Sequence, residues 1–181
     1  MPPAEFRPIR ASPGPVPVSG TSERAVFNPS PVFRRARPDE APALSEIALA
    51  AKQSWGYPPE WMAEWRHDLI VTPAYIRAEP VAVAELAGEV VGFVGLSTAA
   101  EGRYLEHLWL RPRHIGRGLG RALFAEGVRM ARAAGDTELH IKSDPNAEPF
   151  YLKMGAVRTG LEVYQLLGRF PREVPYLTYQ L

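Results

Sequence analysis

The 181-residue sequence contains no cysteine. This absence excludes disulfides, thiolate metal sites and a covalent acyl-cysteine intermediate together. We predict no metal cofactor, and any group transfer must use another nucleophile or go directly to the acceptor. An excess of charge is also missing, since 21 Lys and Arg oppose 20 Asp and Glu. Nucleic-acid-binding proteins normally carry a basic surplus, so we expect no nucleic-acid partner.

Long hydrophobic runs are missing as well. The most apolar stretch, residues 81–96, is interrupted by Glu85 and Glu89, whereas a membrane helix needs ~20 apolar residues. The N-terminus lacks the apolar segment of a signal peptide. We therefore expect a cytoplasmic protein with no membrane partner, and the chain length favours one folded domain.

Proline is concentrated at the N-terminus. Residues 1–32 include eight prolines and few large apolar side chains. Proline at this density removes amide donors and favours extended, solvated chain. We predict a disordered tail over residues 1–32, although a docking role for it stays open, and a folded domain over residues 33–181.

Strand and helix patterns alternate in the remaining chain. Strands are expected at 33–37, 81–86, 90–96, 104–110, 137–142, 156–159 and 175–181. Helices are expected after a cap at Asp39, at 58–69, at 119–134 and at 146–154. Successive strands on short connections are antiparallel, but the helix at 119–134 makes a crossover. The prediction is an α/β (α+β) fold with a mixed, mostly antiparallel sheet of about six to seven strands and about four helices.

A glycine-rich turn lies between the strand at 104–110 and the helix at 119–134. Backbone N–H groups at such a helix start converge with the positive end of the helix dipole and can hold a pyrophosphate. Gly116, Gly118 and Gly120 would let the phosphates approach the backbone. A dinucleotide fold needs this turn after the first strand of a parallel unit, and a nucleotide P-loop needs Gly-Lys-Ser/Thr. Neither condition is met.

Two motifs in this region are similar to the GNAT superfamily of acyl-CoA-dependent N-acyltransferases. One is Leu-Trp-Leu-Arg-Pro followed by Gly-Arg-Gly-Leu-Gly-Arg-Ala-Leu, and the other is Asn146-Ala147 with Phe150-Tyr151. The resemblance runs from about Phe33 to the C-terminus. It implies a GNAT-like fold, acetyl-CoA as co-substrate, and direct transfer of the acetyl group to a primary amine of a small molecule or peptide.

The resemblance also assigns cofactor contacts. The strand before the turn lends backbone groups to the pantetheine arm, and the turn amides hold the pyrophosphate. In this chain these roles fall on Leu108, Trp109, Leu110, Ile115, Gly116, Arg117, Gly118, Leu119, Gly120 and Arg121. The family usually has Gln or Arg at Ile115, and its Asn usually stands where this chain has Asp144. We give the Asn role to Asn146.

The reaction needs a base for the amine and an acid for the departing sulfur. The resemblance makes Tyr151 the acid, with packing under the sheet as the alternative. Glu106 lies in an apolar stretch of strand, where burial is expected to make it a stronger base. The alternatives are a salt-bridged Glu106 and, second, His107 as base.

The sequence says less about the acceptor than about the cofactor. Aromatic side chains of the second helix region either cover an acceptor pocket or belong to the core: Trp55, Tyr57, Trp61 and Trp65. The transferred group could also be an acyl group longer than acetyl. The resemblance also allows a homodimer, which is frequent in the family. The runner-up function is a non-catalytic acyl-CoA sensor. The presence of both Tyr151 and Glu106 favours catalysis over sensing.

Overall fold

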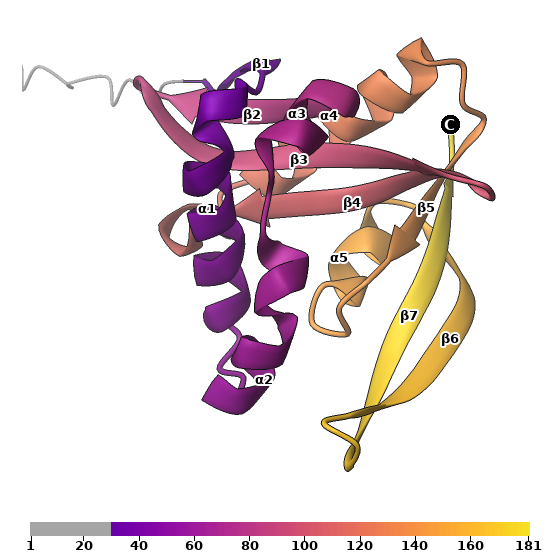
Figure 1. The fold of residues 1–181 in the computed structure, drawn as a ribbon. Coiled ribbons are helices and arrows are strands. Elements are labelled where there is room, and N and C mark those ends of the chain that lie inside the picture. Colours follow the sequence, from indigo (N-terminus) through magenta and orange to yellow (C-terminus); the bar gives the residue numbers. More distant parts are fainter. Residues whose placement is uncertain (1–29) are drawn as a thin grey trace, which may run out of the picture.

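Seven strands form one mixed sheet in the computed structural model, which describes residues 30–181 (Figure 1). The order across the sheet is β1-β2-β3-β4-β5-β7-β6. Strands β4 and β5 run parallel, and the other neighbours are antiparallel. The strands are β1 (Val32–Arg35), β2 (Val81–Leu86), β3 (Glu89–Ala99), β4 (Gly102–Leu110), β5 (Glu138–Lys142), β6 (Val157–Leu166) and β7 (Phe170–Gln180).

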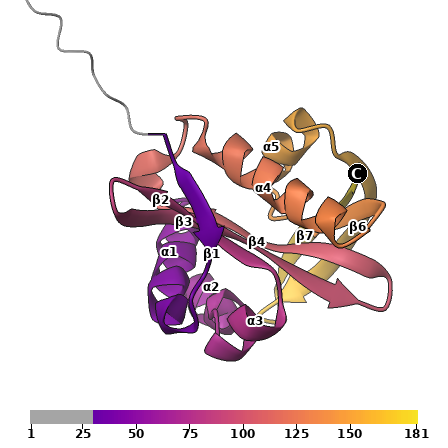
Figure 2. The ribbon, with the colours of Figure 1, turned by 90° about the horizontal axis from the view of Figure 1, so that it is seen from above.

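Five α-helices lie in two layers on either side of the sheet (Figure 2). Helices α1, α2 and α3 cover one face, and α4 and α5 cover the other. The bounds are α1 (Ala41–Gln53), α2 (Pro59–Glu64), α3 (Pro73–Ala78), α4 (Leu119–Ala133) and α5 (Glu148–Lys153). The predicted mixed α/β architecture is confirmed, including the crossover through α4 between parallel strands.

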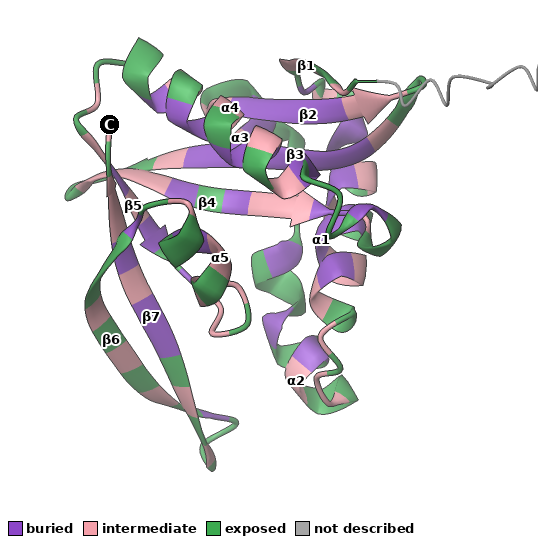
Figure 3. Cartoon of the chain, turned by 180° about the vertical axis from the view of Figure 1, so that it is seen from behind, coloured by how far each residue is buried: buried purple, intermediate pink, exposed green. Residues whose placement is uncertain are grey.

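Strand alternation divides the buried side chains between two cores. On β2, Ala82 and Ala84 face α4, whereas Val81 and Val83 face α1. Successive side chains of a strand point to opposite faces, so a sheet covered on both sides needs apolar residues at every position. Figure 3 shows continuous burial along β2 and β3, in contrast to β6, which is mostly exposed or half-buried. The apolar run at 81–96 is therefore the centre of the fold.

The beginning of the domain differs from the sequence prediction in two details. Strand β1 begins at Val32, one residue inside the predicted tail, and Val32 pairs with Glu85 of β2. The remaining tail residues, 1–29, lie outside the described part. Asp39 does not cap α1, because it lies inside a 3₁₀ turn at Pro38–Glu40. Glu40 precedes the helix instead, and its carboxylate accepts from the Arg37 amide.

One element was not predicted from the sequence, and two strands were predicted too short. Thr72 caps the short helix α3 by accepting from the Tyr75 amide, and this helix lies between the predicted helix at 58–69 and the predicted strand at 81–86. The last two strands are also longer than expected and form a hairpin that projects beyond the rest of the sheet (Figure 1). Residues 160–174 were missed because their exposed strand alternates without a strong apolar signal.

Candidate active site

A cavity opens where strands β4 and β5 part. The two strands share a single paired position, Tyr104 with His140. Beyond that position both strands contribute to a cavity of about 610 Å³, together with the turn before α4 and with α5. Parallel strands that separate at their carboxyl ends leave backbone groups and side chains accessible between them.

The glycine-rich turn forms one end of this cavity. Gly116 and Gly118 have φ of +81° and +84°, and Gly118 is the N-cap of α4. A Cβ at either position would meet nothing within 4 Å, so neither glycine is required by packing. Positive φ is disfavoured for other residues. The turn therefore presents its backbone to open space at the positive end of a 15-residue helix.

Most of the predicted cofactor residues line the same cavity. They are Leu108, Trp109, Leu110, Ile115, Gly116, Gly118, Gly120, Arg121 and Asn146. Two do not. The Leu119 side chain is buried in the α4 core, and the exposed Arg117 lies outside the cavity lining. For these two residues only the backbone of the turn remains available for the predicted role.

Backbone amides of β4 also face the cavity. The Arg111 amide donates to the Val91 carbonyl on β3. Because N–H groups alternate between the two edges of a strand, the amides of Leu110 and Leu108 face the opposite edge, towards β5. That edge has no strand pairing there, since β5 pairs with β4 only at Tyr104. Two amide donors are thus available to a ligand.

Glu106 occupies a β-bulge. Leu96 pairs with Leu105 and Gly95 pairs with His107, so Glu106 has no partner on β3. Its carboxylate lines the cavity and accepts from the Ser97 hydroxyl at 2.9 Å. The prediction that Glu106 is buried is wrong, because the bulge leaves its side chain exposed. Bulges often re-aim a side chain beside an active site, and this one places a carboxylate at the cavity.

His107, the second candidate base, is buried and lies outside the cavity lining. Its ring contacts Tyr75 and Phe93 in the core beneath α1 and α3. Its Nδ1 accepts from Trp109 Nε1 at 3.2 Å. Burial lowers the pKa of His107 to about 4, against the opposing effect of the Glu106 charge. His107 is therefore a neutral packing residue near pH 7.

Tyr151 lies on α5 and lines the cavity opposite the β4 strand. Its ring packs against Phe124 and Phe150, and its side chain is mostly buried. Burial raises the pKa of Tyr151 well above its usual range, and the charge of Asp144 adds to the effect. Within residues 30–181, the side chains of Asp144 and Asn146 bond to the Tyr57 hydroxyl and leave the Tyr151 hydroxyl without a partner. Tyr151 is thus a protonated phenol with a free donor.

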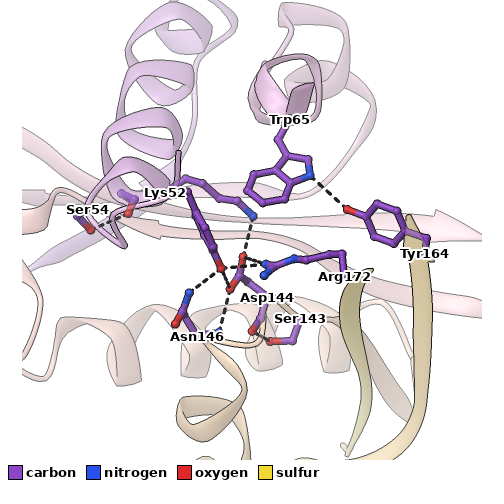
Figure 4. Close-up of polar contacts among 10 residues, drawn as sticks. Lys52, Ser54, Trp65, Ser143, Asp144, Asn146, Tyr164 and Arg172 are labelled. Carbon is purple, nitrogen blue, oxygen red and sulfur yellow. Dashed lines mark hydrogen bonds and ion pairs between the residues drawn. The ribbon is translucent and has the colours of Figure 1, made fainter. Parts of the chain in front are cut away.

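A buried ion network borders the cavity through Asp144 and joins three parts of the fold (Figure 4). Asp144, which follows β5, pairs with Lys52 of α1 at 2.8 Å and with Arg172 of β7 at 2.7 Å. Tyr57 donates to the same carboxylate at 2.8 Å. Burial alone would raise the pKa of Asp144, but Lys52 and these hydrogen bonds lower it below its usual value. Burial lowers the pKa of Lys52, and Asp144 opposes that shift.

Sequence reasoning missed Lys52 and Arg172. Lys52 is 92 residues from Asp144, and no local pattern marks either cation as buried. Asn146, the predicted cofactor residue, is tied to this network because its Nδ2 donates to the Tyr57 hydroxyl at 2.6 Å and its amide donates to Asp144. The network therefore orients the loop that carries Asn146 beside the cavity.

The four aromatic residues of the predicted acceptor region have mixed roles. Trp55 lines the cavity and contacts Trp109. Trp65 is buried, and its Nε1 donates to the Tyr164 hydroxyl of β6 at 3.2 Å (Figure 4). Trp61 packs between Tyr57 and Phe170. The core alternative is confirmed for Trp65, whereas Trp55 lines the cavity, and an acceptor role for these rings stays a prediction.

A second cavity of about 410 Å³ adjoins the first on the outer side of α4. The two share Arg121, Lys153 and Met154. Arg129 and Arg132 also line the second cavity, and Arg129 is paired with Glu126. The other three cations form no ion pair within residues 30–181. This surface is positive and continues from the glycine-rich turn.

Residues 30–181 contain neither a metal-binding cluster nor a membrane-spanning helix. No group of three or more His, Asp and Glu side chains is placed to hold a metal ion in this part of the chain. Its helices are all too short or too polar to cross a membrane.

Comparison with known proteins places this arrangement in a family. The model of the acetyltransferase (GNAT) family matches residues 41–156. The peptidyl-lysine N-acetyltransferase YiaC of Escherichia coli K12 is 31% identical over 125 residues, which are 68% of this chain and 82% of that protein.

Solved structures share the fold. A GCN5-related N-acetyltransferase from Rhodopseudomonas palustris has a TM-score of 0.70 at 23% identity, covering 84% of this chain and 96% of its own. The PaiA N-acetyltransferase of Thermoplasma acidophilum, in complex with coenzyme A, has a TM-score of 0.63 at 16% identity, covering 84% and 99%. None of these comparisons favours a non-catalytic sensor. The chain belongs to the acetyltransferase (GNAT) family and is an N-acetyltransferase.

Proposed function

We propose that the protein transfers the acetyl group of acetyl-CoA directly to the side-chain amine of a peptide lysine. One observation carries the proposal: a single cavity brings together the glycine-rich turn, the unpaired amides of β4, Glu106 and Tyr151. These are the parts needed to hold a thioester, accept a proton and donate one.

The cavity suits a long anionic thioester. The turn from Ile115 to Arg121 would hold the pyrophosphate, and the free amides of Leu108 and Leu110 would meet the pantetheine arm. Asn146 would add a side-chain contact. The adjoining second cavity, with Arg121, Arg132 and Lys153, fits the additional phosphate that coenzyme A carries on its ribose. When bound, acetyl-CoA supplies the activated acetyl group.

Glu106 is proposed as the base. An acceptor ammonium must lose a proton before it can attack a carbonyl carbon. The bulge exposes the Glu106 carboxylate to the cavity, so it can attract the cationic acceptor and take its proton directly or through water. The Ser97 hydroxyl holds the carboxylate in place. His107, buried and neutral on the other face, is the weaker candidate.

Tyr151 is proposed as the acid. Its hydroxyl stays protonated because burial raises its pKa, and it has no competing hydrogen-bond partner among residues 30–181. A thiolate leaving the carbonyl carbon would accept this proton, which the phenol regains from water. The Leu110 amide would stabilise the negative charge that develops on the carbonyl oxygen.

Peptide lysine as acceptor rests on the similarity to YiaC, whose name states that activity. Trp55 at the cavity wall offers an aromatic face to a lysine ammonium, and Glu106 offers the opposite charge. A cytoplasmic location is proposed with it, and a homodimer stays a prediction.

The test measures coenzyme A release from acetyl-CoA with three acceptors: a lysine peptide, the same peptide with arginine, and a small polyamine. Tyr151→Phe is expected to lower kcat by ~10² or more without a matching rise in the KM for acetyl-CoA. Tyr104→Phe, on β4 outside the cavity lining, is the control. Full kcat in Tyr151→Phe would remove the acid role, and equal turnover with the arginine peptide would exclude the lysine acceptor.

A further inference from the structure

Lysine is scarce in this chain. Only three of the 21 basic residues are Lys, at positions 52, 142 and 153, and the other 18 are Arg. A guanidinium stays protonated and cannot serve as an acetyl acceptor at neutral pH. The protein therefore exposes very few side chains that its own chemistry can modify.

The three lysines lie in different surroundings. Lys52 is buried in the ion network with Asp144, where its side chain is 13% exposed. Lys153 lies on α5 and lines both cavities, beside Arg121 at the end assigned to the phosphates. Lys142 is the last residue of β5 and lines the main cavity together with Glu106 and Tyr151.

Strand alternation places Lys142 on the face of the sheet away from α4. Leu139 and Ile141 pack into the α4 core, so Lys142 points to the opposite side. There it pairs with Glu162 of β6 at 2.9 Å and lies 5.6 Å from the ring of Tyr176 on β7. About half of its side chain, 52%, is exposed.

We propose that Lys142 is an internal acetyl acceptor, and that the protein acetylates it from bound acetyl-CoA. The inference rests on the proposed function, because the same thioester supplies the acetyl group. It differs from that function in naming a modification site within the chain itself. The observation that carries it is a half-exposed lysine that lines the same cavity as the proposed base and acid.

The step is a simple acyl transfer. The neutral Lys142 Nζ forms a C–N bond to the acetyl carbon while the C–S bond breaks. One proton leaves the nitrogen for a carboxylate or water, and the departing sulfur gains one, so the products are acetyl-lysine and free coenzyme A. No oxidant or metal takes part.

The charged groups around Lys142 determine how fast it is acetylated, because only the neutral amine attacks the thioester. Burial opposes the Lys142 charge, but Glu162 and Tyr176 raise the pKa of its ammonium above the usual value. Glu106 and Asp144 line the same cavity, but Asp144 is already paired with Lys52 and Arg172. The amine is thus mostly protonated near pH 7, so self-acetylation is slow there and accelerates as pH rises. Glu162→Gln removes one partner and is expected to increase the rate about two- to fivefold, as for loss of a partly exposed ion pair.

Acetylation would change the acceptor side of the cavity. The ion pair with Glu162 would be lost, while Glu162 keeps the hydrogen bond from the Tyr176 hydroxyl at 2.8 Å. One positive charge disappears from the wall that a cationic acceptor approaches. The modified protein is expected to have a lower KM for a lysine peptide.

The experiment incubates the full chain with acetyl-CoA alone and maps acetylated peptides by mass spectrometry. Acetyl-Lys142 is expected, with Lys153 and Lys52 unmodified as internal controls. The first-order rate should stay constant over a tenfold range of protein concentration. Lys142→Arg should leave position 142 unmodified, and Tyr151→Phe should slow the modification as it slows turnover, which separates it from chemical acetylation.

A parallel assay with the lysine peptide separates the two hypotheses. Peptide turnover without acetyl-Lys142 would overturn this inference and leave the proposed function intact. A rate proportional to protein concentration would overturn it too, since the transfer would then be intermolecular. Absence of both activities would overturn the proposed function and the inference with it.

Discussion

Asp144→Asn is expected to destabilise the fold strongly, because it leaves two buried cations without their counter-charge. The side chains of Lys52 and Arg172 are 13% and 11% exposed, and that of Asp144 is 6% exposed. Breaking such a pair from one side costs about 3–5 kcal/mol. For a chain of this size, each kcal/mol lowers the melting temperature by about 2–4 °C. The expected loss is therefore about 10 °C.

Thermal unfolding followed by circular dichroism measures this loss. The amide keeps the shape of the side chain, so the change isolates the charge. Glu126→Gln, which removes an ion pair with Arg129 on the surface of α4, is the control and should leave the melting temperature nearly unchanged. Adding Lys52→Met to Asp144→Asn removes one uncompensated cation and should recover part of the loss.

The pH dependence of the stability follows from the direction in which the pKa of Asp144 is shifted. The pKa of Asp144 is lower in the folded protein than its usual value of 3.8. A carboxyl of this kind stabilises the fold above its unfolded pKa, and the stabilisation is lost as pH falls through the folded pKa. The difference between wild type and Asp144→Asn should therefore be constant near pH 7 and shrink below about pH 4. A melting temperature within about 2 °C of wild type at pH 7 would refute the reasoning.

Three further predictions concern the cofactor site and the tail. Gly118→Val should abolish acetyl-CoA binding in calorimetry, since its side chain enters the open space before α4; Gly135→Val, at a similar φ of +86° but outside the cavity, should lose comparable stability and still bind. Wild-type affinity in folded Gly118→Val would remove the phosphate site. Arg132→Ala should raise the KM for acetyl-CoA about three- to tenfold. The KM for acetyl-CoA that lacks the ribose phosphate should stay unchanged. An equal rise in both KM values would exclude contact between Arg132 and the ribose phosphate. Deletion of residues 1–29 should shift the melting temperature by less than about 2 °C, because the segment has few large apolar groups; a large drop would contradict the tail prediction.

The fold class and the position of the glycine-rich turn before α4 could be predicted from local patterns alone. Buried strands such as β2 and amphipathic helices such as α4 carry strong local periodicity. The glycines before α4 are weak evidence alone, and the neighbouring strand and helix gave them meaning. The order of strands around α4 then implied the parallel crossover. These features depend on residues close together in the chain, so local patterns are sufficient to predict them.

Three features of the site and fold could be seen only in the tertiary structure. The bulge at Glu106 depends on how β4 pairs with β3, and it exposes a carboxylate that the apolar neighbouring residues suggested would be buried. The pairing of Lys52 with Asp144 spans 92 positions. The hairpin of β6 and β7 is held by contacts between its strands, with Trp61 of α2 and with Trp65 just after α2. Each of these features depends on contacts between residues that are far apart in the sequence. Such contacts form only when the chain folds, so local sequence patterns do not reveal them. The same long-range contacts bring Glu106, Tyr151 and Lys142 to one cavity.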